Sequence, residues 1–204
     1  MKPINNFDKV QGYSGSTQLP VGGYVLKITG VRYEAGQNGY SDRIVIAFDV
    51  AEGEFAGFFK KRFDSDTSED KKWKGTTTLY VPKEDGSKQD EWTARRFKTF
   101  TNALEDSNSG YKWDWEESKW KGLLVGGAFG EVHTLIDGKQ IQYNTFKSAY
   151  SVDDIRKGNF KTPKPQYKNG TYAGSNLQAS ANSMPDSNGF YNMDNLDDDE
   201  GVPF

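Results

Sequence analysis

The sequence lacks several chemical groups that common classes of protein need. It contains no cysteine, which excludes disulfide bonds and thiolate metal ligands. Its one histidine, His133, has no second histidine or cysteine to complete a zinc site or a nucleophilic pair. No stretch approaches about 18 apolar residues, and the first residues form no apolar run, so we expect neither a membrane span nor a secretion signal.

Two segments resemble ligand-binding loops only superficially. Asp64 to Asp70 is acidic, but Glu69 stands where a calcium-binding turn needs glycine. Gly126 to Gly130 lacks the Lys-Ser/Thr ending of a phosphate loop. We therefore expect no bound cofactor and no enzymatic activity. The alternative is a metal-dependent nuclease, for which carboxylates are available at Asp49, Glu52 and Glu54.

Aromatic residues are abundant relative to other apolar residues. They make up 14% of the chain, while hydrophobic residues as a whole reach 34%. This composition favours a small barrel or sandwich with an aromatic core and further rings on its surface. The net charge of -3 is uneven: residues 1–157 carry 23 basic and 23 acidic residues, and residues 158–204 carry 3 and 6. A nucleic-acid site must therefore come from local clusters of cations.

Alternation of apolar and polar residues predicts two long strands near the N-terminus. The first runs from Gly22 to Glu34, with Gly30 marking a bulge, and the second runs from Arg43 to Val50. The turn between them is rich in glycine and asparagine, so the strands form a curved hairpin. Residues 1–20 show no periodicity, and we interpret them as an extended N-terminal arm.

Further elements follow this hairpin in an informative order. They are a strand over residues 76–81, a helix over 90–105, and strands over 122–133 and 140–151 joined by an Asp137-Gly138 turn. The result is an all-β chain with one main helix. Five strands with a helix between the third and fourth are the arrangement of the OB-fold barrel, whose strand face and loops bind oligonucleotides. We assign residues 21–157 to this domain.

Aromatic and basic residues are interleaved in two neighbouring segments. Proteins that bind single-stranded DNA need cations near the phosphates and rings on which bases stack. We therefore predict that Phe58, Lys60, Lys61, Arg62, Lys72, Trp73 and Lys74 bind DNA. The first hairpin adds Tyr33, Tyr40 and Arg43, and the last strand adds Tyr143 and Lys147. Core packing or ordinary solvation is the alternative for each of them.

Other rings and cations have a different interpretation. Trp113, Trp115 and Trp120 alternate with acidic residues that repel phosphate, so we expect these rings to pack over the end of the helix. Three cations on the predicted helix are interpreted as solvated surface: Arg95, Arg96 and Lys98.

The composition changes after residue 157. Gly, Asn, Ser, Pro and Gln dominate residues 158–196, which is typical of a disordered linker. Such a coil would hold the end of the chain roughly 35 Å away on average. Residues 197–204 form an acidic tip, in which Asp197, Asp198, Asp199 and Glu200 precede Pro203 and Phe204. Capture of a terminal ring and carboxylate is a known binding mode, and a solubilising tail is the alternative.

The tip resembles that of bacterial and phage single-stranded-DNA-binding proteins. The resemblance lies in Met193-Asp194, in Asp197 to Asp199 and in the terminal Pro203-Phe204. The chain departs from the family pattern at Glu200-Gly201-Val202, where one aliphatic residue normally stands. The body is similar to phage members of the family in the Gly-Xaa-Tyr opening of its first strand and in its Glu-Gly-Glu-Phe to Phe-Phe-Lys stretch.

This resemblance implies a phage or mobile-element protein in the cytoplasm of a bacterial host. Such a protein coats and protects single-stranded DNA during replication, recombination and repair, and recruits partner proteins through its tip. The resemblance leaves a homo-oligomer open. The alternative is a protein-interaction module, such as a recombination mediator or a host-factor inhibitor, that does not bind DNA itself.

Overall fold

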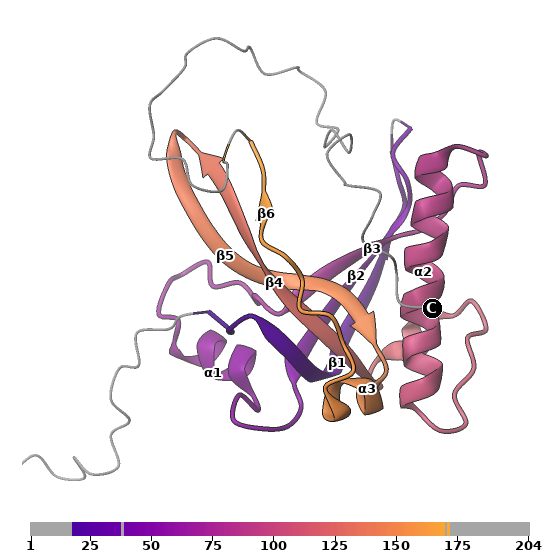
Figure 1. The fold of residues 1–204 in the computed structure, drawn as a ribbon, viewed down its shortest axis with the longest axis horizontal. Coiled ribbons are helices and arrows are strands. Elements are labelled where there is room, and N and C mark those ends of the chain that lie inside the picture. The colour runs from indigo at the N-terminus through magenta and orange to yellow at the C-terminus, as the bar shows by residue number, and fades with distance from the viewer. Residues whose placement is uncertain (1–17, 38, 170, 172–204) are drawn as a thin grey trace, which may run out of the picture. The chain divides into compact units, whose positions relative to one another are not determined.

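The computed structural model describes residues 18–37, 39–169 and 171, which form a strand-rich unit (Figure 1). The strands are β1 (Gly22–Glu34), β2 (Arg43–Val50), β3 (Thr76–Tyr80), β4 (Leu124–Ile136), β5 (Lys139–Tyr150) and β6 (Gln166–Tyr167). The helices are α1 (Phe58–Ser65), α2 (Lys88–Ser107), α3 (Val152–Lys157) and a 3-10 turn, η2 (Glu117–Trp120). The order of strands in the sheet is β3-β2-β1-β4-β5, and β6 pairs with β4.

The first two strands have the bounds that alternation predicts. Ile44, Ile46, Phe48 and Val50 on β2 are all buried, and the residues between them are not. The pairing of β1 with β2 shifts register between Ile28 and Gly30, which confirms the predicted bulge. The bulge lets β1 bend, so that it pairs with β4 through its first half and with β2 along most of its length.

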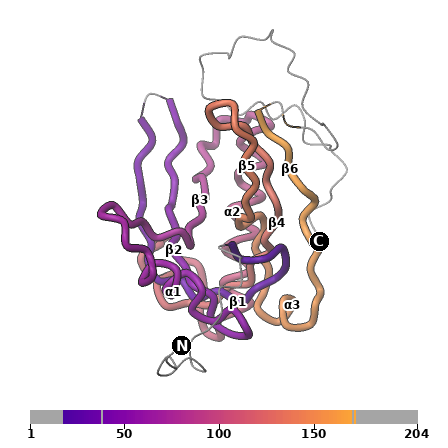
Figure 2. Tube along the Cα trace, turned by 90° about the vertical axis from the view of Figure 1, so that its left-hand side faces the viewer, coloured from indigo at the N-terminus to yellow at the C-terminus, as the bar shows by residue number. Residues whose placement is uncertain are grey.

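The predicted β-rich class is confirmed, but the sheet is not a closed barrel. Among the described strands, β3 and β5 are the two edges of the main sheet and do not pair with each other. Helix α2 contacts β3, β4 and β5, and Figure 2 shows it running along the strands. Its buried Phe97, Phe100 and Leu104 join the same core as Phe48 and Phe129. The helix therefore lies between the two edge strands of the main sheet.

The β4–β5 hairpin turns as predicted. Asp137 and Gly138 have φ values of 50° and 71°, the left-handed conformations that a two-residue type I′ turn requires. Further along β4, close packing excludes a side chain at Gly127, where an added Cβ would lie 2.6 Å from Leu26 Cδ1. The absence of a side chain at Gly127 therefore leaves room for Leu26 and Phe146 in the core.

Residues 158–169 and 171 correct the predicted linker boundary. β6 runs parallel to β4 beside Val132 and His133, and Asn169 Nδ2 donates to Thr134 Oγ1 at 3.1 Å. The ring of Phe160 occupies the space beside Gly23, where an added Cβ would approach it to 2.6 Å. The domain therefore extends past residue 157. The remainder of the predicted linker and the whole tip, residues 197–204, lie outside the described residues.

The predicted N-terminal arm also ends earlier than residue 20. Leu19 is buried in the main core, and Gln18 Oε1 accepts a hydrogen bond from the backbone N–H of Asn144 at 2.9 Å. Residues 18–20 therefore belong to the domain, and residues 1–17 lie outside the described part. None of the described helices combines the length and the apolar character needed to cross a membrane.

Candidate nucleic-acid interface

Helix α1 carries the first predicted cluster, and a side chain from β2 fixes where the helix begins. The Asp49 carboxylate accepts hydrogen bonds from the backbone N–H groups of Phe59 at 2.8 Å and Lys60 at 3.2 Å. These bonds satisfy donors that a helix N-terminus leaves unpaired. Phe59 is buried, and Phe58, predicted to stack on bases, instead packs against the core and edge-on to Phe59 at 5.2 Å. The exposed residues of α1 are Lys60, Lys61, Asp64 and Ser65, so the helix presents polar groups rather than rings to solvent.

Three predicted cations meet around one shallow pocket of about 210 Å³. Arg62 from α1 and Lys72 and Lys74 from the loop before β3 line it, together with Phe63 and Asp66. Bonding to Ser68, with a smaller contribution from nearby lysines, lowers the pKa of Asp66. The pocket keeps an excess of positive charge, which suits a phosphate group.

Trp73, the other ring predicted to stack on bases, is anchored in the protein. Its Nε1 donates to the carbonyl oxygens of Phe48 and Gly75, both at 3.1 Å. Lys71 Nζ lies 4.6 Å from the centroid of the neighbouring Phe63 ring, in a cation–π arrangement. Beside them on α1, Lys61 is exposed, and Lys60 pairs with Asp64 at 2.7 Å. This end of the molecule therefore offers cations more than free rings.

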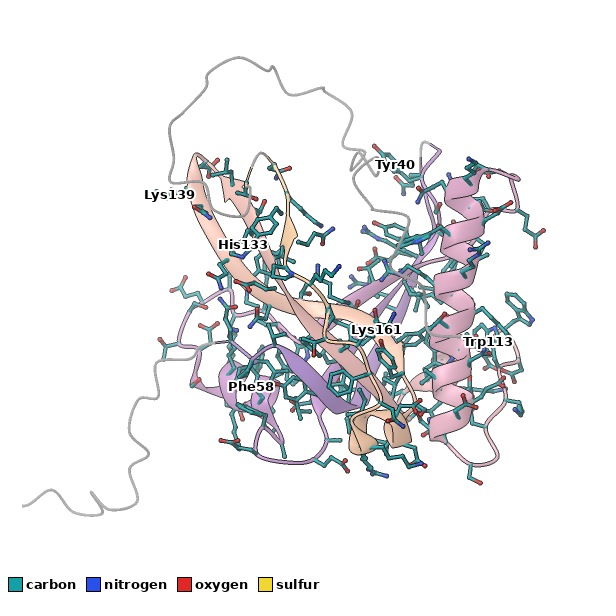
Figure 3. All side chains as sticks on the ribbon, in the orientation of Figure 1. Tyr40, Phe58, Trp113, His133, Lys139 and Lys161 are labelled. Carbon is teal, nitrogen blue, oxygen red and sulfur yellow. The ribbon has the colours of Figure 1, made fainter. Side chains whose placement is uncertain are left out.

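The hairpin residues lie at the opposite end of the same strands. Figure 3 shows Tyr40 at the far tip of β1 and β2 and Phe58 at their other end. Tyr40 is 57% exposed and Tyr33 is 46% exposed. The Tyr33 hydroxyl donates to Asp42, which raises the pKa of the phenol and lowers that of the carboxylate.

Arg43 forms an ion pair with Glu34 on the neighbouring strand. Its Nε donates to Glu34 at 2.6 Å, and Arg32 contacts the other oxygen of that carboxylate at 2.5 Å. The hydrogen bond from Arg43, followed by the contact with Arg32, lowers the pKa of Glu34. One carboxylate thus holds two guanidinium groups together on adjacent strands.

A sheet face joins the two ends, and sequence reasoning missed most of it. Directly paired residues share one side of a sheet, and Arg32 pairs with Val45, Val45 with Thr78 and Arg43 with Tyr80. We call this side, opposite the core, the outer face; its members are Arg32, Arg43, Val45, Ala47, Thr76, Thr78 and Tyr80. None of these side chains is buried. The sequence of residues 76–80 could have indicated this face, because Leu79 is its one strongly apolar aliphatic residue and the only buried one.

The predicted residues on β5 lie apart from both groups. Tyr143 is 37% exposed, and Lys147 is half-buried. Lys147 Nζ donates to Gln166 Oε1 at 2.6 Å, which joins β5 to β6. Burial, with added repulsion from Lys168 and Arg96, lowers the pKa of Lys147 to about 8. A cation held in such surroundings is unusual for a purely structural lysine.

The tryptophan segment packs over helix α2 as predicted, although one of its rings stays largely exposed. Trp120 is fully buried, and its Nε1 donates to the Tyr111 hydroxyl at 2.8 Å. Trp113 lies beside it, with ring centroids 4.9 Å apart. Trp115 is 76% exposed and stacks on Phe97 with a φ of 67°. The acidic residues beside Trp115 led us to expect a packed ring, and they gave no indication that this ring is exposed.

Two of the three carboxylates proposed for a nuclease, Asp49 and Glu52, form other interactions. Asp49 accepts the backbone N–H groups at the start of α1, and Glu52 forms a bidentate pair with Arg156, with both contacts at 2.9 Å. Within the part of the chain that the structure describes, no three His, Asp or Glu side chains are grouped to hold a metal ion. The nuclease alternative therefore has no geometric support in these residues.

Comparison with known proteins leaves the chain without an assigned family. No protein-family model and no curated protein sequence matches it. Function must therefore be inferred from the residues and their geometry.

Proposed function

We propose that this protein binds single-stranded DNA without catalysis, using the outer face and the pocket formed by Arg62, Lys72 and Lys74. We further propose that the domain is an OB fold opened between its third and fifth strands. The antiparallel order β3-β2-β1-β4-β5, with α2 between β3 and β4 in sequence, supports this assignment. OB folds bind oligonucleotides on the face of their second and third strands.

The outer face is the observation that carries the proposal. It is an uncovered sheet surface with cations at both ends: Arg32 and Arg43 beside Tyr80, and Lys74 with Arg62 at the end near α1. Small side chains such as Ala47 and Thr76 separate these ends. A single strand lying along this face would meet cations for its phosphates and an exposed ring for a base.

Recruitment of partners belongs to the tip in this proposal. Asp197 to Glu200 would meet basic groups on a replication or recombination protein, and the ring of Phe204 would enter a pocket. A synthetic peptide of residues 196–204 should compete with the full chain for such a partner. The same peptide without Phe204 should not compete.

The test of DNA binding is an anisotropy titration of labelled oligo-dT at several salt concentrations. We expect binding that weakens with salt, with a slope of log K against log salt of about -0.7 per phosphate contact. Arg62→Gln and Lys74→Gln should each weaken binding and make the slope shallower. Lys121→Gln, an exposed lysine outside both groups, is the matched control. Absence of binding by the unmodified chain would contradict the proposal.

A protein-interaction module is the second candidate, and Trp115 is the observation that favours it. Exposed tryptophans are enriched among residues that dominate protein interfaces. This ring is 76% exposed and held in a left-handed backbone conformation, which costs free energy. If the unmodified chain ignores oligo-dT, capture of a purified replication or recombination protein that Trp115→Ala abolishes would support this candidate.

A further inference from the structure

Cations from two other elements lie within electrostatic range of Lys147 on β5. Arg96 lies on α2, Lys147 on β5 and Lys168 directly after β6. Helix α2 packs against β5, and the hydrogen bond from Lys147 Nζ to Gln166 Oε1 at 2.6 Å ties β5 to β6, which Lys168 directly follows. Both Arg96 and Lys168 are close enough to act electrostatically on Lys147. Sequence reasoning interpreted Arg96 as ordinary surface because its partners are about 50 and 70 residues away.

Two of these cations, Arg96 and Lys147, have no acidic partner among the described residues. The hydrogen-bond acceptor for Lys147 is the neutral amide oxygen of Gln166, at 2.6 Å. Like charges held together in partly buried surroundings destabilise the folded protein. An anion bound between them would relieve that repulsion. The cluster therefore has the character of an anion site rather than of a structural salt-bridge network.

The cluster also offers a flat surface. The Arg96 guanidinium lies 4.8 Å from the centroid of the Trp92 ring, and that ring is 37% exposed. A planar cation supported on an indole presents both charge and a stacking surface to a nucleotide. Lysine carries three donors, of which Gln166 uses one on Lys147.

Tyr80 connects this cluster to the outer face. On β3 it pairs directly with Arg43 of the outer face, and the Tyr80 hydroxyl interacts with that guanidinium. Arg96 lies within electrostatic range of the same hydroxyl. Charged and aromatic groups therefore continue from β2 over β3 to α2, and from α2 to β5.

We propose that Arg96, Lys147 and Lys168 form a phosphate-binding site that carries a bound single strand from the outer face across α2 onto β5. The ligand is the phosphodiester backbone of single-stranded nucleic acid, and the inference rests on the proposed DNA-binding function. It assigns the helix a direct part in binding. The side of the domain where the barrel is open thus becomes part of the path of the strand.

The test compares two substitutions on adjacent residues of one helix. Arg96→Gln removes a cation on the side of α2 that faces this cluster, and Arg95→Gln removes the same charge about 100° around the helix. Both side chains are exposed, so neither change should unfold the protein. Lys147→Met removes the second cation and keeps an apolar side chain of similar length.

We expect Arg96→Gln and Lys147→Met each to weaken oligo-dT binding roughly five- to tenfold at about 50 mM salt, with a salt slope shallower by about 0.7. The double variant should lose about twice that slope, and Arg95→Gln should behave like the unmodified chain. An unchanged slope in the double variant, with Arg62→Gln still weakening binding, would overturn this site and leave the proposed function intact. If the unmodified chain fails to bind, both proposals fail.

Discussion

The ring of Tyr167 on β6 stacks on the imidazole of His133 on β4, with centroids 4.7 Å apart and planes inclined by 14°. His133 also contacts Glu131 through Nε2 at 2.9 Å, and its backbone oxygen accepts the hydroxyl of Thr171 at 3.1 Å. The only histidine of the chain therefore serves as a structural anchor. It holds the described end of the chain against the β4–β5 hairpin.

This stack yields a first prediction. Tyr167→Ala should lower the free energy of unfolding by about 1–2 kcal/mol, because it removes a ring pair and the apolar area the ring covers. Tyr143→Ala is the control, since its side chain has the same exposed fraction of 37% and none of the described ring pairs includes it. Urea denaturation measures both variants. Equal losses of stability would show that the stack adds nothing specific.

The strands and the helix α2 were predictable because local pattern and tertiary burial agree. In β2, alternate residues from Ile44 to Val50 are apolar in sequence and buried in the structure. Helix α2 begins at Lys88, two residues before the predicted start, because the side chain of Ser87 accepts the N–H of Asp90 at 3.1 Å. The predicted cap, Asp90, and the observed cap, Ser87, are close in sequence, so the start of the helix differs by only a few residues.

Other elements were not predictable because distant residues create them. The start of helix α1 is fixed by Asp49, whose carboxylate accepts a hydrogen bond from the backbone N–H of Phe59. The two residues are ten positions apart in the sequence. Residues 158–171 have the polar composition of a linker, yet Phe160 packs beside Gly23 and β6 pairs with β4. Composition indicates how much apolar surface a segment can bury in total. A single ring that fits a gap on the domain, as Phe160 does beside Gly23, can nevertheless hold the segment in place.

In the candidate site too, local clusters could be predicted from the sequence, whereas contacts between distant residues could not. Clustering in sequence located Arg62, Lys72 and Lys74, since neighbours along the chain remain neighbours around the pocket. The packing of the rings in those segments was not predictable from clustering, since Phe58 and Trp73 are partly buried against the core. The cluster of Arg96, Lys147 and Lys168 joins distant residues, which only the packing of α2 on β5 and the contact of β5 with β6 bring together.

The tryptophan segment provides a second prediction. Trp120→Ala should cost about 3–5 kcal/mol of stability, because this ring is fully buried and its removal leaves a large cavity. Trp115→Ala should cost under about 1 kcal/mol, since most of that ring is exposed. Chemical denaturation separates the two cases. A large loss for Trp115→Ala would mean that its stack on Phe97 carries more of the core than its exposure indicates.

Lys147 gives a prediction about pH. Its pKa is about 8 in the folded protein against an ordinary value of 10.5, so the unfolded chain binds more protons between these two values. The contribution of Lys147 to the free energy of unfolding therefore rises as the pH increases from 8 towards 10.5, and below pH 8 its charge destabilises the fold. Lys147→Met should stabilise the protein at pH 7, and this advantage should shrink by pH 10.

Urea titrations at the two pH values measure this difference. Lys61→Met, which removes an exposed lysine of α1, is the control for the loss of a lysine side chain. If Lys147→Met differs from the unmodified protein by the same amount at pH 7 and pH 10, the environment assigned to this lysine is incorrect.

Glu34 provides the last prediction, which concerns DNA affinity. Its carboxylate is paired with both Arg32 and Arg43, so a phosphate approaching this end of the outer face must compete with it. Glu34→Gln removes the competing charge while it keeps the shape of the side chain. We expect oligo-dT binding to become about two- to fivefold tighter at low salt, and the difference to fade as salt screens the charges. Asp106→Asn, an exposed acid near the C-terminal end of α2, should leave affinity unchanged. Weaker binding by Glu34→Gln would mean instead that the acid positions the two guanidinium groups for the strand.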